Sequence, residues 1–264
     1  MAKARKKLEK LALTASPTDK AQTAAEEMRA AYDFVPFEDA DGIVVLGGDG
    51  YMLQTLHQMI DKGRILPAYG MNLGTVGFLM NKREASRLPI LERVNRTRQF
   101  EVSPLMMTAT THGGDTITSC AINEVSLLRE TRQTAKLEIK VGHKVRIPEL
   151  ACDGVLVATP AGSTAYNFSA NGPILPLGCG LLALTPISAF RPRRWRGAIL
   201  PDHLPIEIRC LDAKKRPVSA VADQKEIRDV DSIRVEVAHE RDLTLLFDRG
   251  HSLDERIVAE QFEI

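Results

Sequence analysis

The chain of 264 residues has little net charge, few cysteines and no long hydrophobic run. No apolar stretch approaches the roughly 20 residues that a membrane-spanning helix requires, so we expect no membrane partner. The formal net charge of +1 gives no overall field that would attract nucleic acid, and we expect no nucleic-acid partner. No long apolar segment follows the basic first residues, so we expect no secretory signal and a cytoplasmic location.

The scarcity of cysteine and histidine bears on disulfides and metals. The four cysteines are far apart and include no Cys-x-x-Cys pair, which in a chain without a signal segment predicts free thiols. The six histidines are scattered, without the spacing of metal ligands. We therefore expect no metal held by the protein's side chains, while Mg²⁺ carried in by a nucleotide needs few protein ligands and remains open. The cysteines are Cys120, Cys152, Cys179 and Cys210.

The first hundred residues alternate between strand-like and helix-like segments. Residues 42–46 form a continuous β-branched apolar run, which is typical of a strand buried on both faces. Strand, helix, strand, glycine loop, helix and strand in succession predict an α/β domain over residues 1–99. The other segments of this pattern are 20–32 and 51–62 as helices, and 8–14 and 68–71 as strands.

Short alternating runs separated by turn residues dominate from residue 100 onward. They predict a β-rich domain over residues 100–237. The tail, 238–264, contains one more strand-like run at 243–247, and periodicity alone does not say which domain it joins. The chain has no internal repeat and no low-complexity linker.

A glycine loop, Gly47-Gly48-Asp49-Gly50, lies between the buried strand and the next helix. Glycines let the backbone approach a ligand, and the free amides at a helix N-terminus suit phosphate. A carboxylate in such a loop repels phosphate unless a cation lies between them or the carboxylate serves as a base. Asp49 is therefore a proton acceptor or an outer partner of Mg²⁺, or else it caps an ordinary turn.

Two further polar segments follow strand-like runs. A second glycine pattern spans 71–79, and because loops after successive parallel strands meet at one sheet edge, we expect it near the first loop. Asn123-Glu124 offers amide donors, an amide acceptor and a carboxylate, which fit the polar edge of an adenine or a ribose. A solvated strand end is the alternative interpretation of Asn123-Glu124.

Four blocks, in this order along the chain, resemble the NAD kinase family. The first two are the Gly-Gly-Asp-Gly loop and the segment 72–79, which ends in Gly-Phe-Leu. The third is Asn123-Glu124, and the fourth runs from Asp153 to Ser169. The first block alone is weak evidence, because diacylglycerol kinases and phosphofructokinases share it. The most specific part is Thr159-Pro160-Ala161-Gly162-Ser163-Thr164-Ala165-Tyr166.

The resemblance implies a fold and a reaction. The fold is an α/β N-terminal domain plus a β-rich C-terminal domain, with the C-terminal tail returning to the first domain. The reaction transfers the γ-phosphoryl group of ATP, or of polyphosphate in some members, to the 2′-hydroxyl of the adenosine ribose of NAD, giving NADP. Mg²⁺ would accompany the phosphate donor, and the subunits would form a homodimer or homotetramer.

The resemblance also implies roles for individual residues. Asp49 would be the catalytic proton acceptor, and Gly47, Gly48 and Gly50 would form the phosphate-donor loop. Asn123 and Glu124 would hold the adenosine end of NAD, and Asp153 the nicotinamide side. The implied NAD-binding set is Asp49, Gly50, Asn123, Glu124, Asp153, Thr164, Ala165, Tyr166, Asn167, Phe168, Ser169 and Gln224.

The sequence departs from the family pattern at four points. Tyr51 follows the glycine loop where threonine is frequent, and Ala151 stands where a basic residue is frequent. An Asp-Gly-Gln element is represented only by Ala222-Asp223-Gln224. The usual Pro-His after the Thr-Pro-Ile turn is missing. These departures concern donor handling and contacts with NAD, and they leave Asp49 and residues 164–169 untouched.

The segment Arg191–Arg196 is the densest charge cluster, and the sequence does not assign its role. Its four guanidiniums suit a polyphosphate or an acidic patch on another subunit, with Trp195 as an interface anchor, or they line a solvated loop.

Two other functions compete with the NAD kinase hypothesis. A lipid kinase would need an apolar patch facing a membrane, and none is evident. A non-catalytic NAD(P) sensor would have no need of Asp49.

Overall fold

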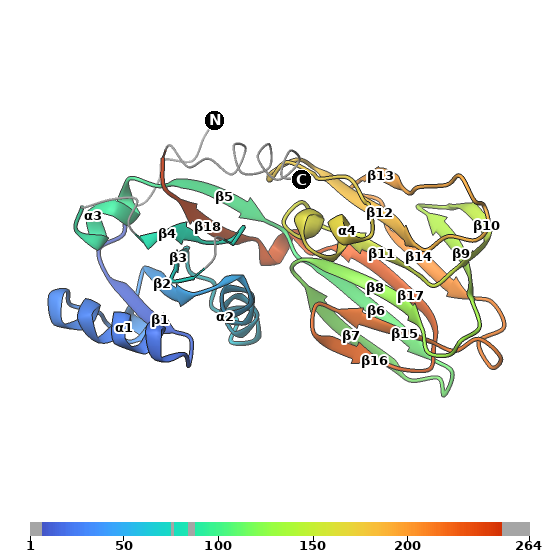
Figure 1. The fold of residues 1–264 in the computed structure, drawn as a ribbon, viewed down its shortest axis with the longest axis horizontal. Coiled ribbons are helices and arrows are strands. Elements are labelled where there is room, and N and C mark those ends of the chain that lie inside the picture. Colours follow the sequence, from blue (N-terminus) through green and yellow to red (C-terminus); the bar gives the residue numbers. More distant parts are fainter. Residues whose placement is uncertain (1–6, 75–76, 84–87, 250–264) are drawn as a thin grey trace. The chain divides into compact units, whose positions relative to one another are not determined.

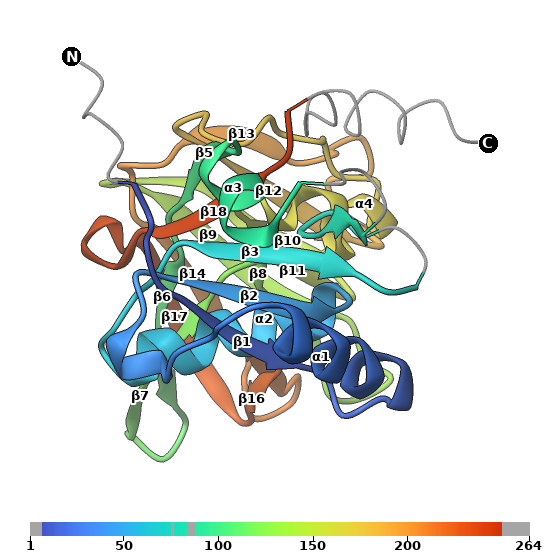
Figure 2. The ribbon, with the colours of Figure 1, turned by 90° about the vertical axis from the view of Figure 1, so that its left-hand side faces the viewer.

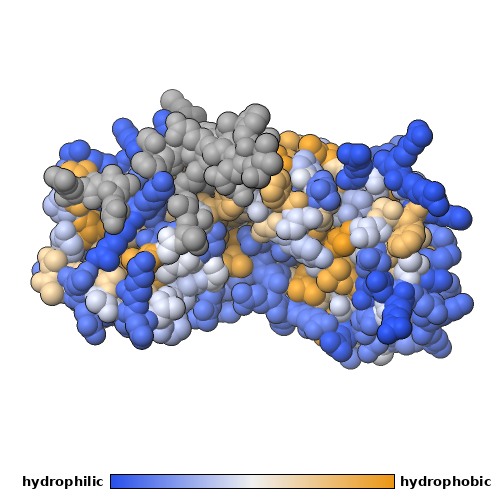
Figure 3. Space-filling view, viewed as in Figure 1, coloured by the Kyte–Doolittle hydropathy of each residue, from blue (hydrophilic) through white to orange (hydrophobic). Residues whose placement is uncertain are grey.

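The computed structural model describes residues 7–74, 77–83 and 88–249. The chain divides into two compact units, Met1–Glu101 with Leu243–Ile264, and Val102–Asp242, called here the first and second units. Figure 1 labels their helices and strands. Hydrophilic residues predominate on the visible surface of both units (Figure 3), as expected of a chain with 26% charged residues.

The first unit is built on one sheet, in which the strands follow the order β1-β2-β3-β18-β5, with β4 paired to β3. The pairs β1–β2, β2–β3 and β3–β18 are parallel. The tail strand β18 therefore lies in the sheet of the first unit, as the expected fold class requires. The strands are β1 Leu11–Ala15, β2 Gly42–Gly47, β3 Ala68–Asn72, β4 Asn81–Lys82, β5 Arg98–Val102 and β18 Leu243–Phe247.

Helices cover both faces of this sheet because successive strand residues point to opposite sides. Helix α1, Asp19–Ala31, packs its alanines and Met28 against one face, together with Val44 and Leu46 of β2. Gly70 of β3 points to the other face, where an added Cβ would lie 2.6 Å from Met52 of α2, Asp49–Asp61. Figure 2 shows α1 on the near side of the sheet. A short helix, α3, spans Ile90–Asn95.

The second unit contains two antiparallel six-stranded sheets, β10-β9-β14-β17-β6-β7 and β13-β12-β11-β8-β15-β16. The strands of the first are β6 Leu105–Thr111, β7 Thr116–Ala121, β9 Ala135–Val141, β10 Lys144–Cys152, β14 Ile206–Cys210 and β17 Val230–Val237. Those of the second are β8 Glu124–Arg129, β11 Gly154–Ala158, β12 Leu181–Ile187, β13 Ala198–Pro201, β15 Val218–Ala222 and β16 Lys225–Ile227. Short helical segments within the described residues include α4 Tyr166–Ser169, η1 Phe37–Asp39, η3 Gly162–Thr164 and η4 His239–Arg241.

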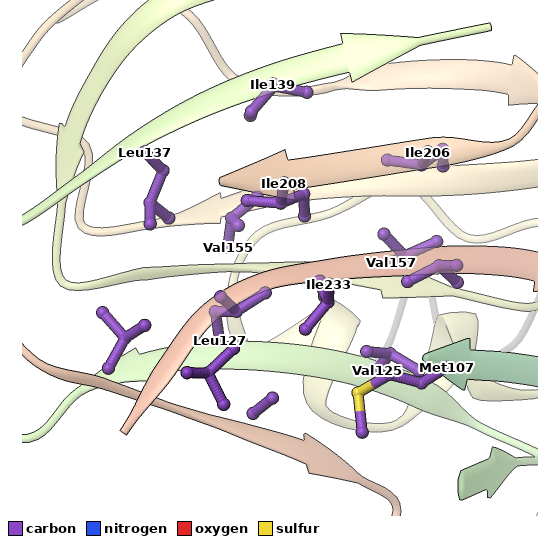
Figure 4. Packing of buried hydrophobic residues seen from close by; sticks show 14 of the residues in the cluster. Met107, Val125, Leu127, Leu137, Ile139, Val155, Val157, Ile206, Ile208 and Ile233 are labelled. Carbon is purple, nitrogen blue, oxygen red and sulfur yellow. The ribbon is translucent and has the colours of Figure 1, made fainter. Parts of the chain in front are cut away.

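The core of the second unit lies between its two sheets. Alternate residues of each sheet point inward, such as Leu137 and Ile139 from β9, and Val155 and Val157 from β11 (Figure 4). The remaining residues of β11 face outward. Of these, Leu156 and Ala158 pack under Leu175, so the segment after β11 covers the outer face of its sheet.

All four cysteines are free thiols, which confirms the expectation from their spacing. Burial raises the pKa of Cys152 to about 12 and that of Cys210 to about 11, so both thiols stay protonated near neutral pH. Among the described helices, none is long and apolar enough to cross a membrane.

Candidate functional site

The carboxylate of Asp49 is held by the second glycine segment. The backbone N–H of Phe78 donates to its Oδ2 at 2.6 Å, and that of Leu79 to its Oδ1 at 3.0 Å. The two loops meet because Gly47, the last residue of β2, lies opposite Asn72, the last residue of β3. Residues 75–76 of the second segment lie outside the described residues. The expected convergence of the two loops on one sheet edge is confirmed.

Gly77 leaves the space that Asp49 occupies. A Cβ built at Gly77 would lie 2.1 Å from Oδ1 and 2.7 Å from Oδ2 of Asp49. No side chain fits there unless the carboxylate moves. The glycine is therefore required for the position of Asp49, in addition to the two N–H donors that follow it.

The glycine loop itself opens helix α2. The helix starts at Asp49, two residues before the expected start, because the N–H of Met52 already bonds the carbonyl of Gly48 at 3.1 Å. Cβ atoms built at Gly48 and Gly50 would meet no atom within 4 Å. The first turn of a helix leaves backbone N–H groups without helical partners. The loop thus combines open space with N–H donors, a combination that suits an anion.

In the second unit, several site residues gather at one end of three neighbouring strands. Glu124 opens β8 opposite Ala158, the last residue of β11. On the other side of β8, Val125 lies opposite Ala222, the last residue of β15. The Asn123-Glu124 segment is therefore flanked by the loop after β11 and by the Asp223-Gln224 turn. We call this group of three segments the sheet-end cluster.

Thr159 ties the loop after β11 to the Asn123-Glu124 segment. Its hydroxyl donates to the carbonyl of Ile122 at 2.7 Å, and its N–H donates to the carbonyl of Asn123 at 2.9 Å. Gly162 packs against the same backbone, since an added Cβ would lie 2.1 Å from the carbonyl oxygen of Asn123. The Thr-Pro-x-Gly turn thus places the residues that follow it beside Asn123.

Asp223 is a member of the cluster that the sequence analysis did not select. Its carboxylate accepts hydrogen bonds from the N–H groups of Ile122 at 2.7 Å, Asn123 at 3.0 Å and Glu124 at 3.2 Å. The available signal was an aspartate in a two-residue turn directly after an apolar strand. Its neighbour Gln224, one of the expected NAD-binding residues, is exposed at the tip of this turn.

Glu124 has a buried acceptor atom without an internal partner. Its Oε2 has no hydrogen bond within the part of the chain that the structure describes. Burial, followed by the nearby charge of Asp223, raises the pKa of Glu124 from 4.5 to about 7. A buried acceptor normally has a donor, so a ligand that supplies an O–H or N–H would satisfy this one.

The raised pKa of Glu124 predicts a pH dependence of stability. The folded state binds more protons than the unfolded state between pH 4.5 and about 7, so stability falls as pH rises through that window. Glu124→Gln keeps the side chain neutral. We expect its free energy of unfolding, minus that of the wild type, to increase by on the order of 3 kcal/mol across the window. Urea denaturation at a series of pH values measures this, and a pH-independent difference would contradict it.

The fourth block contributes an exposed aromatic pair. Tyr166 and Phe168 of α4 are 37% and 40% exposed, which is unusual for large apolar side chains and suits contact with a flat ligand. Burial raises the pKa of Tyr166, and the carboxylates of Glu124 and Asp153 raise it further. Close by in the chain, Thr164 and Ala165 are half-buried and Ser169 is exposed.

Asn167, one of the expected NAD contacts, is bonded inside the protein. Its side chain is fully buried, and its amide donates to the carbonyls of Ser163 at 3.0 Å and Pro173 at 2.8 Å. Its Oδ1 accepts the hydroxyl of Thr185 at 2.7 Å. Both amide hydrogens are thus used inside the protein. Asn167 thus fixes the shape of the loop, and its contact with NAD stays a prediction.

Asp153 lies at the other end of β11 from Asn123-Glu124. It precedes Gly154, which pairs with Leu128 near the far end of β8. Five strand residues separate it from the sheet-end cluster, a length of about 17 Å. Its carboxylate pairs with Arg129 at 2.6 Å. Asp153 is thus not grouped with Asn123-Glu124, although its charge reaches Tyr166.

The arginine-rich segment is anchored to the second unit. Ala151 and Arg191 exchange backbone hydrogen bonds of 2.9 and 3.2 Å, and the four arginines of the segment are exposed. Trp195 packs against the core of its own unit, so its indole ring is not fully available for an interface. In residues 7–74, 77–83 and 88–249, no group of three or more His, Cys, Asp or Glu residues is arranged to hold a metal ion.

Two family models match the chain: the ATP-NAD kinase N-terminal domain over residues 1–99, and the ATP-NAD kinase C-terminal domain over residues 122–246. An NAD kinase of Rhizorhabdus wittichii is 61% identical over 256 residues, covering 97% of this chain and 99% of that protein. An NAD kinase of Zymomonas mobilis is 57% identical over 258 residues, covering 98% and 99% respectively.

Two solved structures share the fold. The yeast NADH kinase complexed with NADH has a TM-score of 0.80 at 23% identity, covering 97% of this chain and 88% of that chain. An NAD kinase from Archaeoglobus fulgidus in complex with ATP has a TM-score of 0.74 at 24% identity, covering 96% and 98%. The expected fold class is therefore confirmed.

An α/β unit that presents a Gly-Gly-Asp-Gly helix start, followed by a β-sandwich unit, defines the chain as a kinase, a transferase of phosphoryl groups. The chain belongs to the ATP-NAD kinase family. The resemblance seen in the four sequence blocks is confirmed by these matches, as is the prediction of NAD kinase activity with ATP as the phosphate donor.

Proposed function

We propose that Asp49 accepts the proton of the 2′-hydroxyl on the adenosine ribose of NAD while ATP phosphorylates that oxygen. The observation that carries the proposal is the fixed position of its carboxylate. The N–H groups of Phe78 and Leu79 bond to the carboxylate, and Gly77 leaves room for it. A carboxylate oxygen can accept a proton, and these two hydrogen bonds hold both oxygens of Asp49 in place. A fixed carboxylate also costs less ordering when the substrate arrives.

The proposed step balances as follows. The ribose O–H bond breaks and its proton moves to the carboxylate of Asp49. The hydroxyl oxygen forms a bond to the γ-phosphorus as the bond from that phosphorus to the β–γ bridging oxygen breaks, which releases ADP. The N–H groups at the start of α2, beside Gly48 and Gly50, face the phosphate donor. Mg²⁺ enters with that donor and is held mainly by phosphate oxygens.

NAD is held by the second unit in this proposal. Asn123 and Glu124 bind polar atoms of the adenosine end, with the unpartnered Oε2 of Glu124 as an acceptor. Tyr166 stacks on a ring of NAD, while Thr164, Ala165 and Ser169 line the same face. Asp153, paired with Arg129, lies about 17 Å along the strand from the sheet-end cluster. In this proposal Asp153 binds the nicotinamide side of NAD, at a place separate from the adenosine end.

A pair of assays tests the function. NAD binding is measured first by calorimetry, and NADP formation is then followed with ATP and Mg²⁺, with polyphosphate in place of ATP as a parallel reaction. We expect saturable NAD binding and NADP formation that requires ATP. Binding of NAD without NADP formation under any donor would support a sensor and contradict the proposed function.

Gly77→Ala tests whether turnover depends on the position of the Asp49 carboxylate. The added methyl overlaps the carboxylate position, so Asp49 must rotate or shift. We expect turnover to fall on the order of 10²-fold, because small misplacement of a catalytic group has effects of that size. Gly113→Ala is the control, since its Cβ would meet nothing closer than 3.7 Å. Wild-type turnover in Gly77→Ala would show that catalysis does not depend on this position of the Asp49 carboxylate.

A further inference from the structure

The Asp223-Gln224 turn supports the segment that we propose to bind NAD. It joins β15 to β16, whose end residues Ala222 and Lys225 are paired. The backbone of Asp223 has a φ of 51°, the left-handed region that aspartate tolerates better than most residues. In this conformation its N–H donates to the carbonyl of Glu124 at 3.1 Å, while its carboxylate turns back over the same segment. The strained backbone of Asp223 therefore makes a specific hydrogen bond to Glu124.

The carboxylate of Asp223 accepts from three successive backbone N–H groups. Oδ2 bonds Ile122, and Oδ1 bonds both Asn123 and Glu124. Ile122 and Asn123 form the short connection from β7 to β8, and Glu124 is the first residue of β8. Bonds to an ionised acceptor are about twice as strong as neutral ones. The carboxylate thus fixes three consecutive peptide units at the edge of the sheet.

We propose that Asp223 is a positioning residue for NAD: by binding the N–H groups of residues 122–124, it sets the direction of the Asn123 and Glu124 side chains. The inference rests on the proposed role of Asn123 and Glu124 in binding NAD. Asp223 itself does not contact the substrate in this account. It acts through the backbone, together with Thr159 on the opposite side, so the segment is held between two turns.

The charge of Asp223 has a second effect on the same site. It lies close enough to Glu124 to disfavour a second negative charge there and so raises the pKa of Glu124, after burial itself. Asp223 from the β15–β16 turn and Tyr166 from α4 both interact electrostatically with Glu124. Removing the charge of Asp223 therefore moves the titration of Glu124 toward lower pH. A purely structural aspartate elsewhere in the fold would not do this.

Asp223→Asn is the test. The amide has one acceptor oxygen and turns an NH₂ group toward at least one of the three N–H donors. We expect the KM for NAD to rise roughly tenfold, the equivalent of about one lost hydrogen bond to a charged group, with kcat and the KM for ATP within about twofold. We also expect the pH midpoint for titration of Glu124 to fall. It is measured from the pH dependence of the stability difference between Glu124 and Glu124→Gln proteins, once with Asp223 present and once with Asp223→Asn.

Asp229→Asn is the matched control. Asp229 is also in the left-handed region, with a φ of 53°, and lies in the connection from β16 to β17, but it is exposed and outside the sheet-end cluster. We expect wild-type values of KM and of the pH midpoint. If Asp223→Asn does not fold, Asp223→Gly tolerates the same backbone without the carboxylate and is measured in the same way.

A double-mutant cycle separates the inference from the proposed function. In an Asn123→Ala, Glu124→Gln background, Asp223→Asn is expected to raise the KM for NAD by less than about threefold, because the side chains it positions are gone. Equal effects in both backgrounds would overturn the positioning role. An unchanged KM in Asp223→Asn would do so as well. If Asn123→Ala, Glu124→Gln itself leaves NAD binding intact, the proposed NAD site fails, and the inference fails with it.

Discussion

The Asp49→Asn variant is expected to bind NAD with near wild-type affinity and to form NADP about 10²–10⁴-fold more slowly. The amide has nearly the shape of the carboxylate but cannot accept the ribose proton at neutral pH. It also turns an NH₂ group toward one of the N–H donors of Phe78 and Leu79, which adds to the loss. Single-turnover NADP formation with saturating NAD and ATP measures the chemical step.

Asp61→Asn is the control for Asp49→Asn. It makes the same substitution at the exposed C-terminal end of the same helix, and we expect wild-type turnover. NAD affinity is measured separately by calorimetry, so that loss of binding is not mistaken for loss of chemistry. Turnover of Asp49→Asn within about threefold of the wild type would remove proton transfer from the role of this residue.

Arg93→Met is expected to lower the free energy of unfolding by about 3–5 kcal/mol. Arg93 is 4% exposed and pairs with Asp248 at 2.7 Å, just after the tail strand β18. Its guanidinium also donates to the carbonyls of Lys82 and Arg83, and it lies over the ring of Tyr69. Without it, Asp248 retains a buried charge, partnered chiefly by the hydroxyl of Tyr69 at 2.9 Å.

Arg96→Ala is the matched control, three residues further along. Arg96 pairs with Glu92 on the surface, where the two side chains are 65% and 45% exposed, and we expect a change below about 1 kcal/mol. Urea denaturation of the intact protein compares both variants with the wild type. A loss of stability in Arg93→Met as small as in Arg96→Ala would show that this buried ion pair does not fasten the tail to the first unit.

The first unit was the more predictable from sequence. Strands β2 and β3 lie within one residue of the expected bounds because strands buried on both faces leave continuous apolar runs. The start of α2 was placed two residues late, since Asp49 and Gly50 lie outside the apolar stripe of the helix. The pairing of the tail strand with β3 depends on contacts distant in sequence, such as Asn81 donating to Leu246, which no local pattern contains.

Two strands of the second unit, β10 and β12, lack the alternation of polar and apolar residues by which periodicity finds a strand. Strand β10 is an edge strand with register shifts, and most of its first six residues are exposed, so its polar and apolar residues do not alternate. Strand β12 is buried on both faces, with Leu182 and Leu184 in the sandwich core and Ala183 under the outer loop. Polar and apolar residues do not alternate in β12 because both of its faces are buried, whereas in β10 most of the first residues are exposed.

Residues that act through the backbone were the hardest to find in the site. Asp223 and Asn167 are ordinary turn and helix residues in sequence, and only the folded chain shows what their side chains bond. The motif that contains Asn167 led to its assignment as a ligand contact, and only the structure shows that its buried amide is bonded inside the protein. Glycine patterns were more informative: Gly77 and Gly162 each mark a close approach to a site residue.

Proton transfer to Asp49 is tested most directly by a crystal structure with NAD, an ATP analogue that resists hydrolysis, and Mg²⁺. We expect an Asp49 oxygen about 2.6–3.2 Å from the ribose 2′-oxygen, or joined to it through one water, with the γ-phosphoryl group on the far side of that oxygen. A ribose bound with its 2′-hydroxyl directed away from Asp49, beyond the reach of one water, would contradict it.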